Sequence, residues 1–133
     1  MSQENVESLR RAVEAFNGRD RPAWLALCDP ELENYPPRDW PESAPIQGRE
    51  AVWDFYVEGI EPWERGVLRL TEEIEAGDDQ VVAHLRGEMQ GKASGVGVTW
   101  SFWQVITFRD GRAVRIRWFA DRAEALEAAG LRE

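Results

Sequence analysis

The sequence predicts an α+β domain in which helices pack on one face of an antiparallel sheet. Two observations lead to this prediction. Apolar residues recur at helical spacing through most of the first half of the chain, and from about residue 66 they recur at every second position. The joints between the later segments, above all Asp110-Gly111, carry residues typical of β-hairpins. The expected order is therefore helix, helix, strand, helix and a four-stranded meander.

The first helix is predicted over 2–17, with Ser2 or Asn5 as its N-cap and Asn17-Gly18 as its end. Its apolar positions lie three or four residues apart: Val6, Leu9, Val13 and Phe16. This spacing gives the helix one apolar side, which we expect to face the sheet.

A second, shorter helix is predicted over 20–30. Asp20 stands at the capping position, and Pro22 falls in the first turn, where the missing N–H costs nothing. Pro30 is expected to end this helix, and Cys28 to lie on the buried side of its last turn as an inert thiol.

A short strand is predicted over 31–35, followed by an irregular, proline-rich segment over 36–48. Its part from Pro36 to Pro45 is a candidate lid, with a plain surface loop as the alternative. The third helix is expected from Gly48 to Trp63. Its apolar stripe comprises Val52, Phe55, Tyr56, Gly59, Ile60 and Trp63.

The meander and a closing helix complete the chain. The four strands are predicted at about 66–76, 80–91, 95–108 and 112–120. The last helix is expected over 121–130, with Gly130 at its C-terminal end.

Composition and charge narrow the classes of partner. A chain of 133 residues fits one domain, predicted over 1–133. The net charge of −9, with dispersed arginines, argues against nucleic-acid binding, which needs clustered basic residues. No apolar run approaches the roughly 20 residues of a membrane span, and the N-terminus lacks a signal peptide's apolar run. With its single cysteine, the chain is predicted to be soluble and cytoplasmic.

No motif for a metal or cofactor stands out in the sequence. His84 is the only histidine, and the carboxylates are scattered rather than spaced as metal ligands. The glycines of "GKASGVG" lie in a predicted hairpin with no helix after it, so they are turn residues. We therefore expect neither a metal nor a cofactor.

Alternation along the strands sorts their side chains into two faces. The residues expected to face the helices are Leu68, Leu70, Ile74, Val81, Ala83, Leu85, Met89, Val96, Val98, Trp100, Phe102, Gln104, Ile106, Phe108, Val114, Ile116 and Trp118. Gln104 is the polar exception, and a buried amide must find hydrogen bonds from neighbours, water or a ligand. His84 is expected on the opposite face, in a solvated or interface role.

Four stretches resemble the SnoaL-like branch of the nuclear transport factor 2-like superfamily: "ENVESLRRAVEAFNGRD", "LCDPELEN", "QGREAVWDFY" and "VITFRDGRAVRIRWFADRAEALEAAGL". Together they span almost the whole chain. The resemblance implies a curved sheet wrapped around three helices, forming a cone with a pocket at its open end. It does not fix an activity, because this scaffold hosts isomerases, cyclases, dehydratases, hydrolases and non-catalytic binders. It also implies a homodimer through the outer sheet face, where Trp103, Val105 and Phe119 would lie.

Two enzymatic branches of the superfamily can be compared position by position. Ketosteroid isomerase-like members carry a catalytic Asp at the place that Asn34 holds here, and an amide cannot abstract a proton. Their oxyanion-binding Tyr would fall near Ala12, and their second donor would fall on Gln104. Asn34 and Gln104 can still donate hydrogen bonds to a ligand carbonyl, but the resemblance does not support steroid isomerase chemistry.

Polyketide cyclase-like members use an acid after the last strand, and Asp121 occupies a comparable place. Two observations favour a capping role instead. Asp121 and Glu124 form a D-x-x-E variant of the capping box, and strand alternation puts Asp121 on the face opposite Trp118. The sequence favours the cap and keeps catalysis as the alternative.

The sequence leaves three functions open. One is an isomerase, cyclase or hydrolase-type enzyme that acts on a small apolar molecule by acid–base chemistry or hydrogen-bond polarisation. The others are a non-catalytic binder of such a molecule and a dimeric interaction module. The candidate catalytic residues are Asp121 and Gln104. The candidate binding residues are Trp24, Asn34, Tyr56, Trp63, Trp100 and Trp118, since the seven tryptophans either fill the core or line a cavity.

Overall fold

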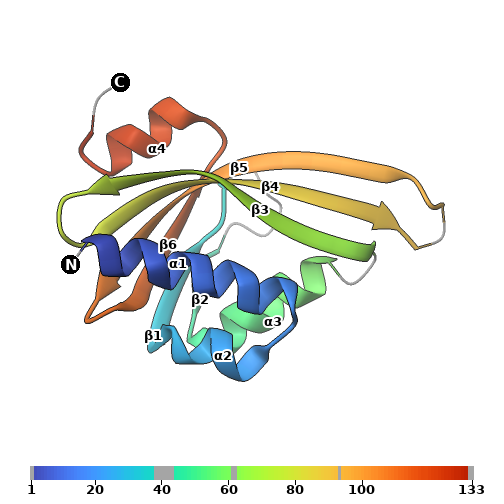
Figure 1. Cartoon of the computed structure of the whole chain (residues 1–133), viewed down its shortest axis with the longest axis horizontal. Helices are drawn as coiled ribbons and strands as arrows, with labels where there is room; N and C mark the ends of the chain where they lie inside the picture. Colours follow the sequence, from blue (N-terminus) through green and yellow to red (C-terminus); the bar gives the residue numbers. More distant parts are fainter. Residues whose placement is uncertain (1, 38–43, 61–62, 93, 132–133) are drawn as a thin grey trace.

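The structure, a computed structural model, describes residues 2–37, 44–60, 63–92 and 94–131, and the side chains of residues 2, 60 and 63–65 lie outside the described part. Four helices and six strands form these ranges (Figure 1). In chain order they are α1 (Ser2–Asn17), α2 (Arg21–Ala26), β1 (Cys28–Tyr35), β2 (Ile46–Gln47), α3 (Arg49–Ile60), β3 (Trp63–Ala76), β4 (Gln80–Gly91), β5 (Gly97–Arg109), β6 (Arg112–Phe119) and α4 (Arg122–Ala128).

The strands form one curved sheet in the order β2-β1-β6-β5-β4-β3 (Figure 1). Helices α1, α2 and α3 lie on one face, called the inner face below, and α4 lies on the other, called the outer face. The predicted α+β class, with three helices on the sheet and a short C-terminal helix, is confirmed. None of the helices in the described ranges is long and apolar enough to cross a membrane.

The sheet is mixed rather than wholly antiparallel. The meander from β3 to β6 is antiparallel as predicted, because hairpins join its strands. Strand β1, however, pairs with β6 in parallel. The two strands are far apart in the chain, so no tight turn forces them to run in opposite directions.

The end of α2 differs from the prediction. Asp20 caps the helix by accepting a hydrogen bond from the Ala23 N–H at 3.2 Å, as expected. The helix ends at Ala26, and Cys28 and Pro30 belong to β1 rather than to the helix. Pro30 is accommodated because the pairing of β1 with β6 is irregular between Cys28 and Glu33, where a missing N–H breaks no ladder bond.

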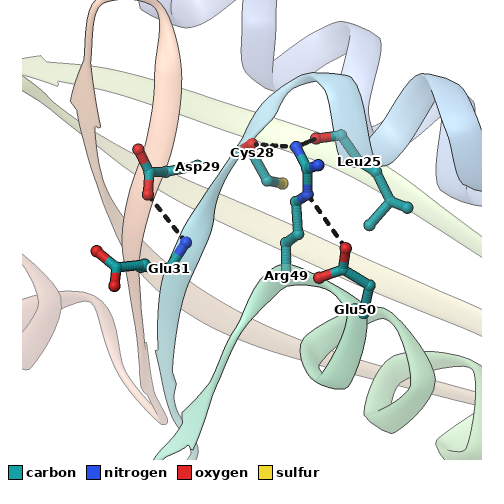
Figure 2. A network of polar contacts seen from close by, with 6 residues as sticks. All are labelled: Leu25, Cys28, Asp29, Glu31, Arg49 and Glu50. Carbon is teal, nitrogen blue, oxygen red and sulfur yellow. Dashed lines mark hydrogen bonds and ion pairs between the residues drawn. The ribbon is translucent and has the colours of Figure 1, made fainter.

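Arg49, at the start of α3, ties this junction together (Figure 2). Its guanidinium donates to the carbonyl oxygens of Leu25 at 3.1 Å and Cys28 at 3.3 Å, and pairs with Glu50 at 3.5 Å. The Leu25 carbonyl lies at the end of α2, where carbonyls lack partners within the helix. One side chain therefore joins α2, β1 and α3.

Other boundaries also differ. Helix α3 ends at Ile60, and Trp63 opens β3 instead of closing the helix. The region predicted to be irregular contains the short strand β2, which pairs with β1. Residues 38–43, the middle of the candidate lid with Trp40, lie outside the described residues.

The α1 side chains of Asn5 and Asn17 both bind backbone groups of the β3–β4 hairpin. Asn5 lies inside the helix, not at its cap, and its side-chain amide donates to the Asp78 carbonyl at 3.1 Å. The Asn17 side chain makes two bonds of 2.8 Å with the N–H and C=O of Leu68, as a neighbouring strand would. Because β3 is an edge strand, the two Asn17 bonds satisfy backbone groups that the sheet leaves unpaired.

Two β-bulges change which side chains face inward. The pairing of β3 with β4 shifts between Leu70 and Glu72, so Ile74 packs in the outer cluster rather than on the inner face. A second shift, between Thr107 and Phe108, brings Ala113 rather than Val114 into the inner core. A single extra residue reverses the alternation beyond it, which strict parity cannot foresee.

Helix α4 covers part of the outer face. Its residues Ala125 and Leu126 form an apolar cluster with Val82, Trp103 and Val105 of the sheet, with Ile74 and Phe119 against it. Trp103, Val105 and Phe119 lie on the outer face as expected, but they pack under this chain's own helix. They are therefore not an open docking surface, and the homodimer remains a prediction for sedimentation to test.

Candidate functional site

A cavity of about 460 Å³ lies between the inner face of the sheet and the helices. Five of the predicted site residues line it: Trp24, Tyr56, Trp100, Gln104 and Trp118. From β5, the alternate residues Trp100 to Phe108 point into it, as their spacing predicts. Val96 and Val98, predicted to do the same, are 59% and 37% exposed, because this end of the sheet projects beyond the helices (Figure 1).

The other predicted site residues lie elsewhere. Asn34 is fully buried behind the cavity lining, on β1. Asp121 is exposed and precedes α4, and it does not line the cavity. Trp63 opens β3, and its side chain lies outside the described residues.

Asn34 joins two walls of the cavity. Its Oδ1 accepts a hydrogen bond from the Tyr56 hydroxyl at 2.7 Å and another from Trp118 Nε1 at 2.8 Å. An indole nitrogen can only donate, so the atom facing it must be the amide oxygen, and this fixes the orientation of the Asn34 amide. Asn34 Nδ2 is buried with no partner among the described residues.

Tyr56 and Gln104 bring the polar groups of the lining together. Gln104 is 7% exposed, and its amide lies within hydrogen-bonding reach of the Tyr56 hydroxyl. Burial raises the pKa of Tyr56 above its usual value, and hydrogen bonding with Trp118 and Gln104 opposes the shift only in part. Tyr56 therefore stays a neutral hydroxyl at physiological pH.

Aromatic rings form much of the lining without filling the space. Trp24 lies 5.9 Å from Tyr56 between ring centroids, and Phe16 lies 6.2 Å from Tyr56. On the sheet side, the Phe102 ring stacks on Trp118 at 4.4 Å. These separations are typical of favourable aromatic pairs, so the rings support one another as rigid walls.

The ionisable groups at the cavity offer little acid–base chemistry. Burial raises the pKa of the Cys28 thiol to about 12, with the nearby Arg49 charge opposing this in part, so the thiol stays protonated. Ser8 donates its hydroxyl to the Gly111 carbonyl at 3.1 Å. Among the described lining residues, Glu58 alone carries a carboxylate, and it is exposed.

Asp121 is the N-cap of α4, as the sequence favours. Its backbone is extended and its Oδ1 accepts a hydrogen bond from the Glu124 N–H at 2.9 Å. The alternative catalytic role remains an untested prediction, and the placement of Asp121 outside the cavity gives it no support.

His84 lies on the outer face, as predicted. Its ring contacts Trp103, with centroids 4.6 Å apart, and Nδ1 hydrogen-bonds the Thr71 hydroxyl. Among the residues that the structure places, no three His, Cys, Asp or Glu side chains gather as a cation site would require.

Part of the lining is not among the predicted site residues. Ser8, Leu9 and Ala12 of α1 and Glu58 and Gly59 of α3 also line the cavity. The apolar stripe of α1 points to Leu9 and the family resemblance to Ala12, but Ser8 is a small residue whose contact with a cavity depends on how the helix crosses the sheet. No local signal marks such a position.

Comparisons with known proteins support this fold. The model of the SnoaL-like domain family matches residues 9–116, which is more than half of the chain. A nuclear transport factor 2-like protein of unknown function from Burkholderia pseudomallei is 27% identical, with a TM-score of 0.75 and coverage of 96% of this chain and 97% of that one. The search of curated proteins gave no match.

Two further solved structures share the fold. TerC, co-crystallised with polyporic acid, is 24% identical, with a TM-score of 0.75 and coverage of 96% of this chain and 98% of that one. A protein from Jannaschia sp., provisionally named a SnoaL-like polyketide cyclase, is 21% identical. Its TM-score is 0.78, and the match covers 91% of this chain and 88% of that one. With the family match, the architecture places this chain in the SnoaL-like domain family of the nuclear transport factor 2-like superfamily.

Proposed function

We propose that the protein binds a small, largely apolar molecule in the cavity and holds one oxygen of that molecule by hydrogen bonds. The observation that carries the proposal is the cavity itself, about 460 Å³ in volume and lined mainly by apolar and aromatic side chains around a few polar groups. Size and lining of this kind are typical of small-molecule sites. The co-crystal of TerC with polyporic acid lends support, because that protein has the same fold.

Gln104 is the group best able to receive the ligand oxygen. The Tyr56 hydrogen is donated to Asn34, so the hydroxyl oxygen of Tyr56 is left as an acceptor. Gln104, within reach of that oxygen, can then direct one N–H at Tyr56. Its second N–H and its carbonyl oxygen are left for a carbonyl or hydroxyl group of the ligand.

Asn34 supports this arrangement from behind. By accepting hydrogen bonds from Tyr56 and Trp118, it fixes the positions of two lining side chains. We therefore assign Asn34 a positioning role rather than the direct ligand contact that the sequence suggests.

Binding without acid–base catalysis fits the site best. A general base must be able to take a proton near the reacting atom, yet the described lining carries neutral Cys28 and Tyr56 and the exposed Glu58. An enzymatic role would depend on polarisation of a ligand carbonyl by Gln104, since a buried hydrogen-bond donor can stabilise developing negative charge.

Calorimetric titration with two isosteric probes tests the proposal. We expect 2-acetylnaphthalene to bind more tightly than 2-isopropenylnaphthalene, which lacks the oxygen, by about two- to tenfold for one hydrogen bond. Gln104→Leu should abolish this preference. Gln80→Leu, the same exchange at a residue outside the cavity lining, should retain it. No binding of either probe to the unaltered protein would contradict the proposal.

A further inference from the structure

Three cavity-lining rings form a row along the inner face. Trp100 stacks on Phe102, with ring centroids 4.7 Å apart and planes tilted by 26°. Phe102 stacks in turn on Trp118, at 4.4 Å and 16°. These three rings are called the ring row below. Trp118 comes from β6 and the other two from β5, and all three line the cavity.

The two ends of the ring row are held differently. The Trp118 end is fixed by the hydrogen bond to Asn34. At the other end, Trp100 is half-buried. Among the described residues its indole nitrogen has no hydrogen-bond partner. Its position therefore depends on packing against the strands beside it.

Gly87 provides the room for Trp100. The two residues are directly opposite each other in the pairing of β4 with β5. A Cβ on Gly87 would lie 2.9 Å from Cε2, 3.1 Å from Nε1 and 3.2 Å from Cζ2 of the Trp100 indole. The first of these distances is shorter than van der Waals contact allows, so the indole would have to move.

The backbone itself does not call for glycine at this position. Gly87 is not among the glycines with positive φ, so an alanine could adopt its conformation. A glycine inside a strand is unfavourable, and it often marks a place where another group approaches the backbone closely. Here that group is the Trp100 ring.

We propose that Gly87 is a specificity-determining residue: by letting the Trp100 indole lie across β4, it completes the ring row and makes the cavity favour flat aromatic ligands over non-planar ones of equal size. This inference rests on the proposed function, since it names the shape of molecule that the cavity selects. A flat ligand can meet near-parallel rings in offset or edge-on contacts, each worth about two- to tenfold in affinity beyond the burial of its surface.

The test compares 2-naphthol with its saturated, non-planar analogue decahydro-2-naphthol by calorimetric titration. We expect the unaltered protein to prefer 2-naphthol by about tenfold. Gly87→Ala should remove most of this preference, because the displaced indole breaks the row. Gly97→Ala, a strand glycine with nothing within 4 Å of its added Cβ, is the matched control and should retain it.

A double variant shows whether Gly87 acts through Trp100. Trp100→Leu alone should reduce the preference for 2-naphthol, and Gly87→Ala should have no further effect in that background. If Gly87→Ala does not fold, the proposal requires that Trp100→Leu restore folding. A double variant that also fails to fold would assign Gly87 a backbone role and overturn the inference.

The outcomes separate this inference from the function on which it rests. If neither alcohol binds the unaltered protein, the proposed function fails. If both bind with equal affinity, or if Gly87→Ala keeps the preference, the cavity still binds apolar molecules and only the role of Gly87 is wrong.

Discussion

At the scale of single residues, Asn34 shows how one buried amide organises a site. A polar side chain in the middle of a sheet is costly unless its hydrogen bonds are satisfied. The Asn34 oxygen meets this requirement through Tyr56 and Trp118, which come from α3 and β6. The sequence marks Gln104 as a polar exception and the family resemblance points to Asn34, but neither can show that Asn34 lies behind the lining and Gln104 in it.

Removal of the Asn34 amide should destabilise the protein markedly. Asn34→Leu would remove the acceptor of the Tyr56 hydroxyl and one hydrogen bond of the Trp118 N–H, at about 1–3 kcal/mol for a donor left unpaired and about 1 kcal/mol for the second bond. Tyr56→Phe removes one donor and leaves the Asn34 oxygen bonded to Trp118, so it should cost less, about 1 kcal/mol. Urea unfolding measures both. An Asn34→Leu variant no less stable than Tyr56→Phe would contradict the network.

Cys28 should make stability depend on pH in the alkaline range. Burial raises the pKa of its thiol from 9.0 to about 12, so the folded protein keeps a proton that the unfolded chain loses above pH 9.0. This contribution is complete below pH 9.0 and is lost as the pH rises toward 12. Between pH 8 and 10 the free energy of unfolding should fall by about 1 kcal/mol more in the unaltered protein than in Cys28→Ala. Equal slopes for the two proteins would refute the buried, protonated thiol.

At the scale of elements, α4 is the feature whose role the sequence leaves open. Its cap and its approximate bounds can be predicted from local residues. Its position over Val82, Trp103 and Val105 cannot, because an apolar outer face is equally consistent with a second subunit. Arg117, on β6, donates to the Ala128 carbonyl at 3.2 Å and so also ties the end of α4 to the sheet.

Substitutions of Asp121 should show that it stabilises the protein as the N-cap of α4. Asp121→Ala removes the acceptor for the Glu124 N–H and should cost about 1 kcal/mol of unfolding free energy. Asp121→Asn keeps an acceptor oxygen and should cost only a few tenths of a kcal/mol. Thermal unfolding distinguishes the two. An Asn variant as unstable as the Ala variant would mean that the carboxylate charge, rather than the cap, is what matters.

The bulges and the parallel pairing of β1 show where prediction from local patterns ends. Alternation correctly gives the inward side chains from Trp100 to Phe108, because the pairing of β5 with β4 has no register shift. It fails at Ile74, beyond the shift in β3, where one extra residue reverses the faces. It also cannot reveal the partner of β1, since that pairing joins residues distant in the chain.

At the scale of the whole molecule, the sheet and helices border an open cavity that the indoles do not fill. Large aromatic residues are compatible with either a solid core or a lined cavity, and composition alone cannot decide between them. The choice depends on how far the helices stand from a curved sheet, which is a property of the assembled fold. The resulting cavity of about 460 Å³ is the basis of the proposed function.

The most direct test of that claim is a two-dimensional NMR titration of the protein with 2-acetylnaphthalene. Binding in the cavity should shift the side-chain amide signals of Gln104 and the indole N–H signals of Trp100 and Trp118. The indole N–H signal of Trp103, buried under α4 on the outer face, should stay in place. Shifts confined to Trp103 and its neighbours, or no shifts at all, would contradict the account.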